Sequence, residues 1–541
     1  DISAAAGGAS IVSLSGNGNV SLGTNNLTLS NGSSTFAGTI SGGGGLALDG
    51  GTEILSGANS YSGGTTISAG TLQIGNGGTT GSIVGDVTDN GTLAFDRSDA
   101  VTFGNVISGS GSLTQVGSGV LTLTGTNTYT GGTTIGTGTL QLGNGGTTGA
   151  IAGDVTDNGT LAFDRSDAVT FGNVISGSGS LAQVGSGVLT LTGTNTYTGG
   201  TTIGTGTLQI GNGGTTGAIA GDVTDNGALA FDHSDDVTFA GAISGSGTLT
   251  QNGGGVLLLN SINSYTGDTT VAAGTLLVGD SAHPTASIAG NVGVDSGATL
   301  GGHGTIGGNV AVASGAHLSP GGSIGTLTVA GDLTVAQGAM LDYEFGAPGS
   351  DYSTAGTGDQ VVVDGNLTLN GATLNVVADP GFGQGLYNVF SYGGSLTETN
   401  GGVTLGTVPA GSTLSIQTLT GSKQINLLNT TGLTLDFWNG NGQASSTQSG
   451  GGNGTWSVTS PNWTDATGSV TTAMQPQPGF AIFGGAAGTV TVDSAAGTVS
   501  TTGMQFATNG YVLDGNALTL VANGSIAPAI RVGDGSSGGA G

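Results

Sequence analysis

The 541-residue sequence has no cysteine, nine prolines and only four lysines and arginines in total. Without cysteine, neither disulfides nor thiolate metal sites can contribute to the fold. The few cations face 32 acidic residues, and the formal net charge of −28 argues against a surface that binds nucleic acid or anionic lipid. No run of 18 or more apolar residues occurs, so no segment has the composition of a transmembrane helix.

Glycine is abundant, and its 116 residues would suggest disorder in a sequence without other order. Here apolar residues alternate regularly with small polar ones, as in Leu121/Leu123 and Leu161/Phe163. That alternation is the period of a strand with one buried face. Gly, Asn, Asp and Ser separate the short strands and supply their turns. We therefore expect an ordered, all-β chain.

One stretch, residues 109–142, recurs along the chain at a fixed period. Its tyrosine lies at Tyr61, Tyr129, Tyr197 and Tyr265, and the position number rises by 68 each time (129−61, 197−129, 265−197). Residues 83–150 and 151–218 differ at only three positions. A fixed period marks a repeat architecture. Coils of about 22 to 23 residues, stacked at about 4.8 Å, predict a parallel β-helix (β-solenoid) with about three rungs per repeat. Equivalent side chains would then return to the same side of the tube every three rungs.

The pattern changes twice along the chain, which predicts three segments. Residues 1–289 form the β-helix of repeats, and residues 290–430 form a less regular solenoid continuation and end section. Residues 431–541 hold all three tryptophans, Trp438, Trp456 and Trp463. We expect this last segment to be the truncated start of a further solenoid block.

The repeated run Gly-Ser-Gly-Val-Leu-Thr-Leu-Thr-Gly-Thr-Asn-Thr-Tyr-Thr-Gly-Gly-Thr-Thr-Ile, residues 117–135, closely resembles the autotransporter-associated (passenger-associated) β-strand repeat of Gram-negative type V secreted proteins. The resemblance implies a right-handed parallel β-helix that crosses the outer membrane and is displayed at the cell surface or released. It implies no cofactor. The family also has a signal peptide and a translocator β-barrel. This chain, which starts at Asp1, shows neither, so the barrel is expected only in the full-length protein.

Repeated carboxylates are the candidates for a metal site. Asp-Val-Thr-Asp-Asn-Gly occurs at 86–91, and its copies lie at 154–159 and 222–227. Clustered oxygens of this kind could hold Ca²⁺, whereas the alternative is an Asx turn closed by Asn-Gly. Neither the EF-hand spacing nor the glycine-rich calcium nonapeptide is met. The candidate ligands are Asp86, Asp89, Asp154, Asp157, Asp222 and Asp225.

Two patterns resemble catalytic motifs but favour a structural explanation. Gly321–Gly325 fits G-x-S-x-G, with His303 and His317 nearby in sequence. A nucleophile elbow needs a helix after the serine, and no helical pattern follows. Asp96 and Asp99 flank an arginine, but the set recurs in the next repeat, which indicates a solvated ion pair rather than a glycosidase pair. We expect no catalytic residue.

The leading hypothesis is a non-enzymatic extracellular passenger that acts as an adhesin, a self-association (biofilm) surface or a stiff display stalk. Its expected partners are other copies of the chain, through lengthwise association, and host or bacterial surface glycans or proteins. A polysaccharide-active β-helix enzyme is the alternative. A threonine array that orders water or binds ice is a lesser one. The tryptophans could stack on sugars, but buried aromatics are commoner.

Overall fold

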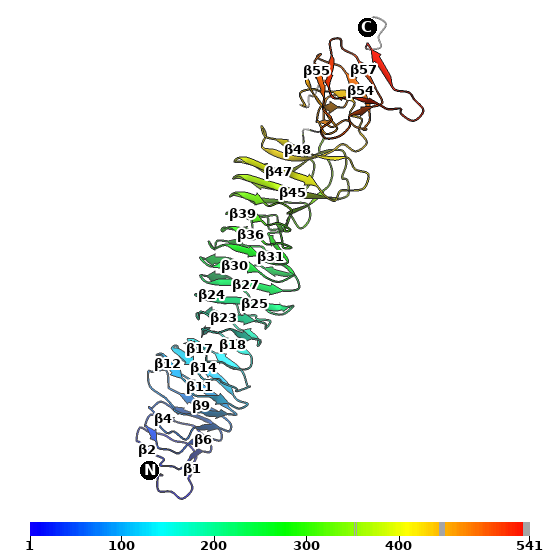
Figure 1. Cartoon of the computed structure of the whole chain (residues 1–541). Coiled ribbons are helices and arrows are strands. Elements are labelled where there is room, and N and C mark those ends of the chain that lie inside the picture. The colour runs from blue at the N-terminus through cyan, green and yellow to red at the C-terminus, as the bar shows by residue number, and fades with distance from the viewer. Residues whose placement is uncertain (351, 353, 443–449, 534–541) are drawn as a thin grey trace. The chain divides into compact units, whose positions relative to one another are not determined.

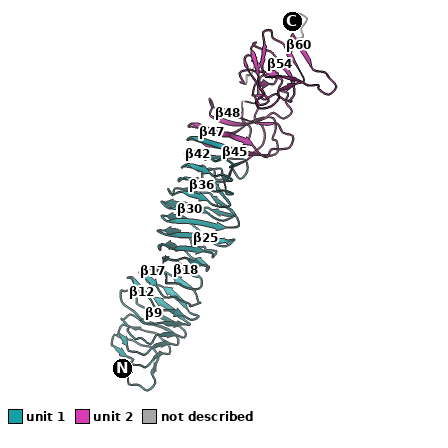
Figure 2. Cartoon of the chain, in the orientation of Figure 1, with its two compact units in different colours: residues 1–340, 363–370 teal, residues 341–362, 371–541 magenta. Residues whose placement is uncertain are grey.

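The computed structural model describes residues 1–350, 352, 354–442 and 450–533, and these residues form strands and turns without a helix. No described segment is a helix of the length and apolarity that a membrane span would take. The chain divides into two compact units (Figure 2). Unit 1 comprises residues 1–340 and 363–370, and unit 2 comprises residues 341–362 and 371–541.

Unit 1 is a parallel β-solenoid in which each strand pairs with strands of the turn before and the turn after (Figure 1). Sheet 1 contains β1 (Ala9–Ile11), β3 (Leu27–Leu29), β6 (Leu46–Leu48), β8 (Thr65–Ile67), β10 (Val87–Asp89) and β13 (Ile107–Ser108). Sheet 2 contains β4 (Thr35–Phe36), β7 (Thr52–Leu55), β9 (Thr71–Ile74), β11 (Thr92–Phe95), β14 (Ser112–Gln115), β16 (Thr133–Ile135), β18 (Val155–Asp157) and β21 (Ile175–Ser176).

Two further sheets carry the coil onward. Sheet 3 contains β12 (Val101–Phe103), β15 (Val120–Leu123), β17 (Thr139–Gly146), β19 (Thr160–Arg165), β22 (Ser180–Gln183), β24 (Thr201–Ile203), β26 (Val223–Asp225) and β29 (Ile243–Gly245). Sheet 4 includes the row β20 (Val169–Phe171), β23 (Val188–Leu191), β25 (Thr207–Gly214), β27 (Ala228–His233), β30 (Thr248–Gln251), β33 (Thr269–Val271), β36 (Val292–Val294), β39 (Val310–Val312) and β42 (Leu333–Val335). The chain is therefore an all-β parallel solenoid, as predicted.

The length of one turn follows from the strand register. In sheet 3, Leu121 pairs with Leu140, Leu140 with Leu161, and Leu161 with Leu181. Three turns thus advance the position number by 60 (181−121), whereas one repeat advances it by 68. The repeat equivalent of Leu121 is Leu189, which lies in sheet 4. One repeat is accordingly about three and one third turns.

Because each turn crosses three sides, the extra third moves every copy to the next side of the tube. The equivalent strands β8, β16, β24 and β33 lie in sheets 1, 2, 3 and 4. The prediction of about three rungs is confirmed, but the expectation that copies return to the same side is wrong. The physical reason is the length of a turn, which is shorter than one third of the repeat, so the repeat does not close after whole turns.

The core of unit 1 consists of columns of inward side chains, one turn apart. In one column Leu121, Leu140, Leu161 and Leu181 are all buried and follow one another in successive turns. Burial of one such side chain contributes about 2 kcal/mol relative to exposure. Since each turn is covered only by its neighbours, stability accumulates turn by turn and sets no upper limit on length.

Unit 2 contains an antiparallel section followed by a second parallel coil. β46 (Gly385–Tyr392) and β48 (Leu414–Leu419) both pair antiparallel with β49 (Gln424–Asn429). Parallel pairing resumes through β54 (Phe480–Phe483), β57 (Gly503–Phe506) and β60 (Ala529–Val532), and through β51 (Gly454–Trp456), β55 (Thr489–Val492) and β58 (Val512–Gly515).

The core of this second coil is aromatic. The Trp456 and Trp463 rings have centroids 4.9 Å apart, and Phe483 lies 5.9 Å from each of them. Trp438, Trp456 and Trp463 are all buried. The tryptophans therefore hold the coil together, and none of them is open to stack on a sugar.

Candidate binding surface

The recurring run Thr-Asn-Thr-Tyr-Thr of each repeat forms a corner of the coil rather than a ligand site. Asn127 is buried, and its Oδ1 accepts a hydrogen bond from the Ile107 amide of the turn before (2.9 Å). Its Nδ2 donates to the carbonyls of Gly125 (3.2 Å) and Ala150 (2.9 Å). At this corner the strand-to-strand hydrogen bonds are interrupted, and buried backbone groups need other partners. The Asn127 side chain is the partner of three of them, one amide and two carbonyls.

The repeat tyrosine lies inside the same corner. Tyr129 is fully buried, and its hydroxyl shares a hydrogen bond of 2.6 Å with Thr133 Oγ1. Burial raises the pKa of the Tyr129 hydroxyl, and the nearby Asp89 carboxylate raises it further. The same pair recurs as Tyr61–Thr65, Tyr197–Thr201 and Tyr265–Thr269. These groups stabilise the core and do not reach solvent.

The six aspartates considered for calcium do not gather around one point. Asp86 is exposed and accepts a hydrogen bond from the Val106 amide (2.9 Å), and Asp154 and Asp222 do the same one and two repeats later. Asp89 points inward, is buried, and accepts a bond from the Gly91 amide (2.9 Å). Among the described residues, no group of three His, Asp or Glu side chains could hold a metal ion.

The buried aspartates Asp89, Asp157 and Asp225 are a feature that sequence reasoning missed. Burial raises the pKa of each carboxyl group, and that of Asp225 rises to about 6. Asp89 leaves no room above it, since a Cβ on Gly111 would lie 2.5 Å from its carboxylate. The second glycine of Gly-Ser-Gly, Gly111 in this repeat, is therefore the sequence signal for the buried aspartate, because a residue with a Cβ would collide with the carboxylate.

Three repeats contain an exposed loop of the sequence Gly-Asn-Gly-Gly-Thr-Thr-Gly. We call its copies loop 1 (75–81), loop 2 (143–149) and loop 3 (211–217). In each, the five residues between the terminal glycines are exposed. Since equivalent positions lie on successive sides of the tube, the three loops project from three different sides. The loops carry no charged side chain.

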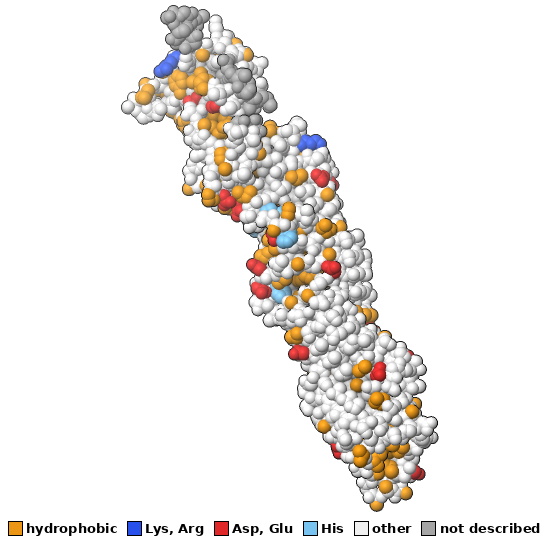
Figure 3. All heavy atoms as spheres, turned by 180° about the vertical axis from the view of Figure 1, so that it is seen from behind, with side chains coloured by type: hydrophobic (Ala, Val, Ile, Leu, Met, Phe, Trp, Pro, Cys, Tyr) orange, Lys and Arg blue, Asp and Glu red, His pale blue; other side chains and the backbone are white. Residues whose placement is uncertain are grey.

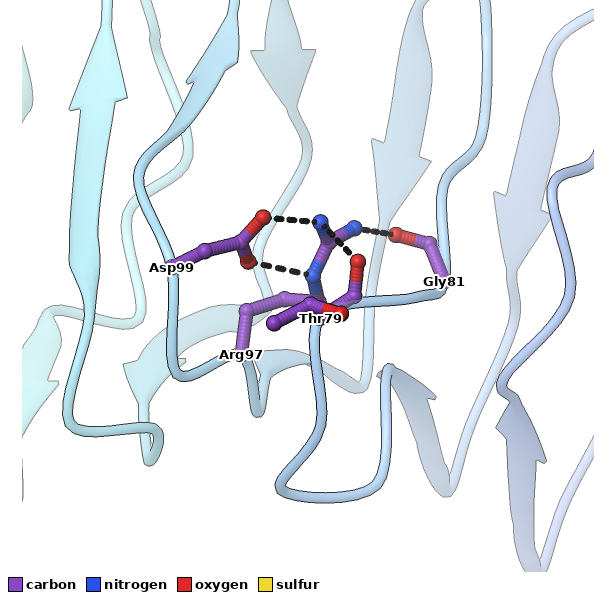
Figure 4. Close-up of polar contacts among 4 residues, drawn as sticks. All are labelled: Thr79, Gly81, Arg97 and Asp99. Atoms are coloured by element: carbon purple, nitrogen blue, oxygen red, sulfur yellow. Dashed lines mark hydrogen bonds and ion pairs between the residues drawn. The ribbon is translucent and has the colours of Figure 1, made fainter.

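Arg97 holds loop 1 from the next turn (Figure 4). Its Nη1 donates to the Gly81 carbonyl and its Nη2 to the Thr79 carbonyl (2.7 Å). The same guanidinium forms a two-point ion pair with Asp99, at 2.9 and 2.8 Å. These bonds lower the pKa of the Asp99 carboxyl group. Asp99 thus forms a local ion pair with the arginine that holds the loop, whereas Asp96 accepts a hydrogen bond from Gln73 Nε2 (3.1 Å).

The clamp is kept in loop 2 and altered in loop 3. Arg165 donates to the Gly149 carbonyl (2.7 Å) and pairs with Asp167 at 2.9 and 2.7 Å. His233 takes this position in the third copy, and its Nδ1 lies 3.1 Å from Asp235 Oδ1. Its Nε2 is buried and has no hydrogen-bond partner among the residues that the structure describes.

The serine motif at Gly321–Gly325 does not form a nucleophile elbow. The turn leads directly into β41 (Thr326–Val329), so the helix that would expose the serine is replaced by a strand. His303 packs against Gly325, where a Cβ would lie 2.5 Å from its Nε2. The site is a turn of the coil.

Outward threonines form short rows rather than a flat array. In sheet 2, Thr114, Thr134, Thr156 and Ser176 are stacked in successive turns. The positions two residues further along the strands are Gly136 and Asn158, so the row is one residue wide. Rotation of the repeat then moves the threonines to another side. This geometry does not favour a water-ordering lattice.

One shallow groove of about 470 Å³ lies on sheet 4 of unit 1. Its floor is Gly293 and Ala311, which replace the threonines of the neighbouring turns, Thr270 and Thr334. One wall is a ladder that begins where Asn291 Nδ2 donates to Asp268 Oδ1 (3.0 Å). The backbone amides of Asn309, Asp332 and Asn366 then each donate to the side-chain oxygen one turn earlier, on Asn291, Asn309 and Asp332 (2.8 Å each). This is the part of unit 1 in which five successive turns present amide or carboxyl groups on one side.

Charged groups are sparse on the surface. On the face shown in Figure 3, acidic side chains stand apart from one another among uncharged polar ones. The fold defines a class: a repeat-built parallel β-solenoid with few charged groups on its surface.

Comparison with known proteins finds similarity in the repeats and over a longer stretch of the chain. The model of the passenger-associated-transport-repeat matches residues 47–74, 113–142, 181–210 and 249–278. The chain is 36% identical over 353 residues to the adhesin BmaC autotransporter of Brucella suis biovar 1 (strain 1330). That alignment takes in 58% of this chain and 9% of the relative, so the chain spans about a tenth of that protein's length. These matches support an autotransporter passenger with passenger-associated repeats.

The four matches end in β9, β17, β25 and β34 (Thr275–Val278), so the family pattern can be placed on the structure. Residues 113–142 run from β14 through the Asn127 corner to β17. The family pattern therefore covers one corner of the coil and the strands on either side of it. Both matches indicate display at the cell surface or outside a Gram-negative bacterium.

Proposed function

We propose that the chain is a non-enzymatic adhesive passenger, which binds surface glycans or proteins through the uncharged polar sides of its solenoid. The observation that supports this most is the surface itself: hydroxyl and amide side chains cover the coil, while the repeated acids are buried or used as backbone caps. The name of the related Brucella protein, an adhesin, agrees with the proposal.

The groove on sheet 4 is the first place to look for the contact. Its hydrogen-bonding wall and small floor suit hydroxyl-rich or amide-rich chains, and Asp268 and Asp332 disfavour anionic partners. Lengthwise self-association is less well supported, because copies of the repeat lie on different sides of the tube. Two parallel tubes could then join equivalent repeat surfaces only at every third repeat.

The test uses the purified chain coupled to inert beads, with attachment to epithelial cells and to bacterial cells scored by microscopy. We expect attachment above that of beads carrying an unrelated solenoid. Gly293→Thr with Ala311→Thr fills the groove and should therefore lower attachment. The fold has room for the threonine at 293, because no atom lies within 4 Å of a Cβ there. Ala47→Thr, on the outer row of sheet 1, is the matched control.

Equal attachment by both bead types would contradict the adhesive function. Loss of attachment with the control variant but not with the groove variant would place the contact elsewhere. The enzymatic alternative has a separate readout: depolymerisation of an acidic glycan on a broad panel, with and without Ca²⁺, would overturn the non-enzymatic assignment.

A further inference from the structure

The strongest feature outside the adhesive surface is the difference among the three loop clamps. Loops 1, 2 and 3 have the same sequence and differ in the side chain that holds them, Arg97, Arg165 or His233. A guanidinium is always charged and always a donor, whereas an imidazole gains its second donor only when it is protonated. We propose that His233 makes loop 3 a pH-responsive latch, clamped when the imidazole is protonated and released when it is neutral.

The contacts of His233 set up this behaviour. Its side chain is 6% exposed, and Nδ1 faces Asp235 at 3.1 Å. A neutral imidazole keeps its proton on the nitrogen that faces a carboxylate, so Nε2 is then an acceptor. Within the described ranges Nε2 has no partner, and it lies against Gly211 at the base of loop 3. A carbonyl group in the loop cannot bond to an acceptor.

Loops 1 and 2 show what a donor at this position does. Arg97 and Arg165 donate to the carbonyls of Gly81 and Gly149, and the equivalent carbonyl in loop 3 is that of Gly217. Among the described residues, no donor is found for the Gly217 carbonyl. A proton taken from solvent by Nε2 would supply a charge-assisted donor at the base of loop 3, in the place of the guanidinium.

The charged surroundings of His233 are all acidic. Asp235 is its direct partner. Asp232 accepts a hydrogen bond from Gln209 Nε2 (3.2 Å), and Asp236 accepts one from the Val256 amide (3.2 Å). Loop 3 and the next turn, residues 251–255, contribute no charged side chain. Protonation of His233 is therefore the charge change that can act on the loop.

The experiment uses the absence of cysteine from the chain. Thr148→Cys and Thr216→Cys each place one nitroxide spin label on the exposed part of loop 2 or loop 3, in the full chain. Electron paramagnetic resonance then reports label mobility between about pH 8 and about pH 5.5, the range in which histidine ordinarily titrates. We expect the label at 216 to lose its fast-moving component as the pH falls, and the label at 148 to stay unchanged.

Two substitutions make the result specific. His233→Arg should abolish the pH dependence at 216 and give the mobility seen at 148. His233→Leu, which has no hydrogen-bond donor at any pH, should leave the label at 216 mobile at both pH values. Far-UV circular dichroism confirms that each variant is folded. Mobility at 216 that does not change with pH in the wild-type background, or that still changes in the His233→Arg variant, would overturn the proposal.

Discussion

Asp436 should make the stability of unit 2 depend on pH near neutrality. The residue precedes β50 (Phe437–Trp438), and its Oδ1 has no hydrogen-bond partner in the described part of the chain. Gly479 packs over it, since a Cβ there would lie 2.5 Å from that oxygen. Burial raises the pKa of the Asp436 carboxyl group from 3.8 to about 7. The experiment compares the free energy of unfolding at pH 5 and at pH 8, in the wild-type chain and in the Asp436→Asn variant.

The sign follows from the raised pKa. The folded state holds the proton more tightly than the unfolded state, so the contribution of Asp436 is complete below its unfolded pKa. It is lost as the pH rises through about 7. A shift of about three units corresponds to about 4 kcal/mol in full. Because the carboxyl group is only partly buried, water screens it, and about 2 kcal/mol is a better expectation.

The tryptophans give a local assay. All three lie in unit 2, so the fluorescence change in urea follows this unit rather than the repeats. We expect the free energy of unfolding to fall by about 1 to 2 kcal/mol from pH 5 to pH 8, which moves the urea midpoint by about 1 M. Asp436→Asn should remove this difference. Asp514→Asn, at an exposed position, is the matched control and should retain it. A midpoint that is the same at both pH values, or an undiminished shift in Asp436→Asn, would refute the reasoning.

Three further predictions concern the repeats and the coil as a whole. Asn127→Ala leaves the buried Ile107 amide without its partner and should cost about 2 to 3 kcal/mol in urea unfolding followed by circular dichroism, whereas the exposed neighbour Thr126→Ala should change stability by less than about 0.5 kcal/mol. An equal effect of both would mean that the corner is not tied by the amide. Tyr129→Phe should cost about 1 kcal/mol through the lost Thr133 bond, measured in the same way, and no loss would show that the buried bond contributes nothing net. Tryptophan fluorescence and far-UV circular dichroism should give different unfolding midpoints, because the coil is stabilised turn by turn; coincident transitions would indicate one cooperative unit.

Much of the fold could be predicted because the alternation of apolar and small residues fixes which side chains face inward. Leu121, Leu123 and Phe163 are buried as expected. The turn length could not be predicted from the period, since copies that are identical in sequence give no information about the side on which each one lies. That information is in the register, where the pairing of Leu121 with Leu140, and of Leu140 with Leu161, decides the rotation.

The candidate sites were predicted less well for a related reason. Asp86 and Asp89 are three residues apart and look alike in sequence, yet one caps a surface turn and the other is buried beneath Gly111. Alternation along β10 (Val87–Asp89) places Asp89 on the inward side with Val87, but the run Asp89-Asn90-Gly91 also fits an Asx turn at the surface, and that interpretation hides the buried carboxylate. The loop clamp also depends on a contact between Arg97 and Gly81, which lie in different turns of the coil. A local sequence pattern does not predict such a contact.

The third of a turn left over in each repeat gives copy number a geometric meaning. Residues 83–150 and 151–218 are so similar that whole repeats can be gained or lost by recombination without disturbing the core. Each gain would lengthen unit 1 by about 16 Å. It would also turn every later coil of that unit, the groove at 268–334 included, to face another direction. Three gains would restore the original bearing. A change in the number of repeats would therefore change the direction in which a surface patch faces without changing the patch itself.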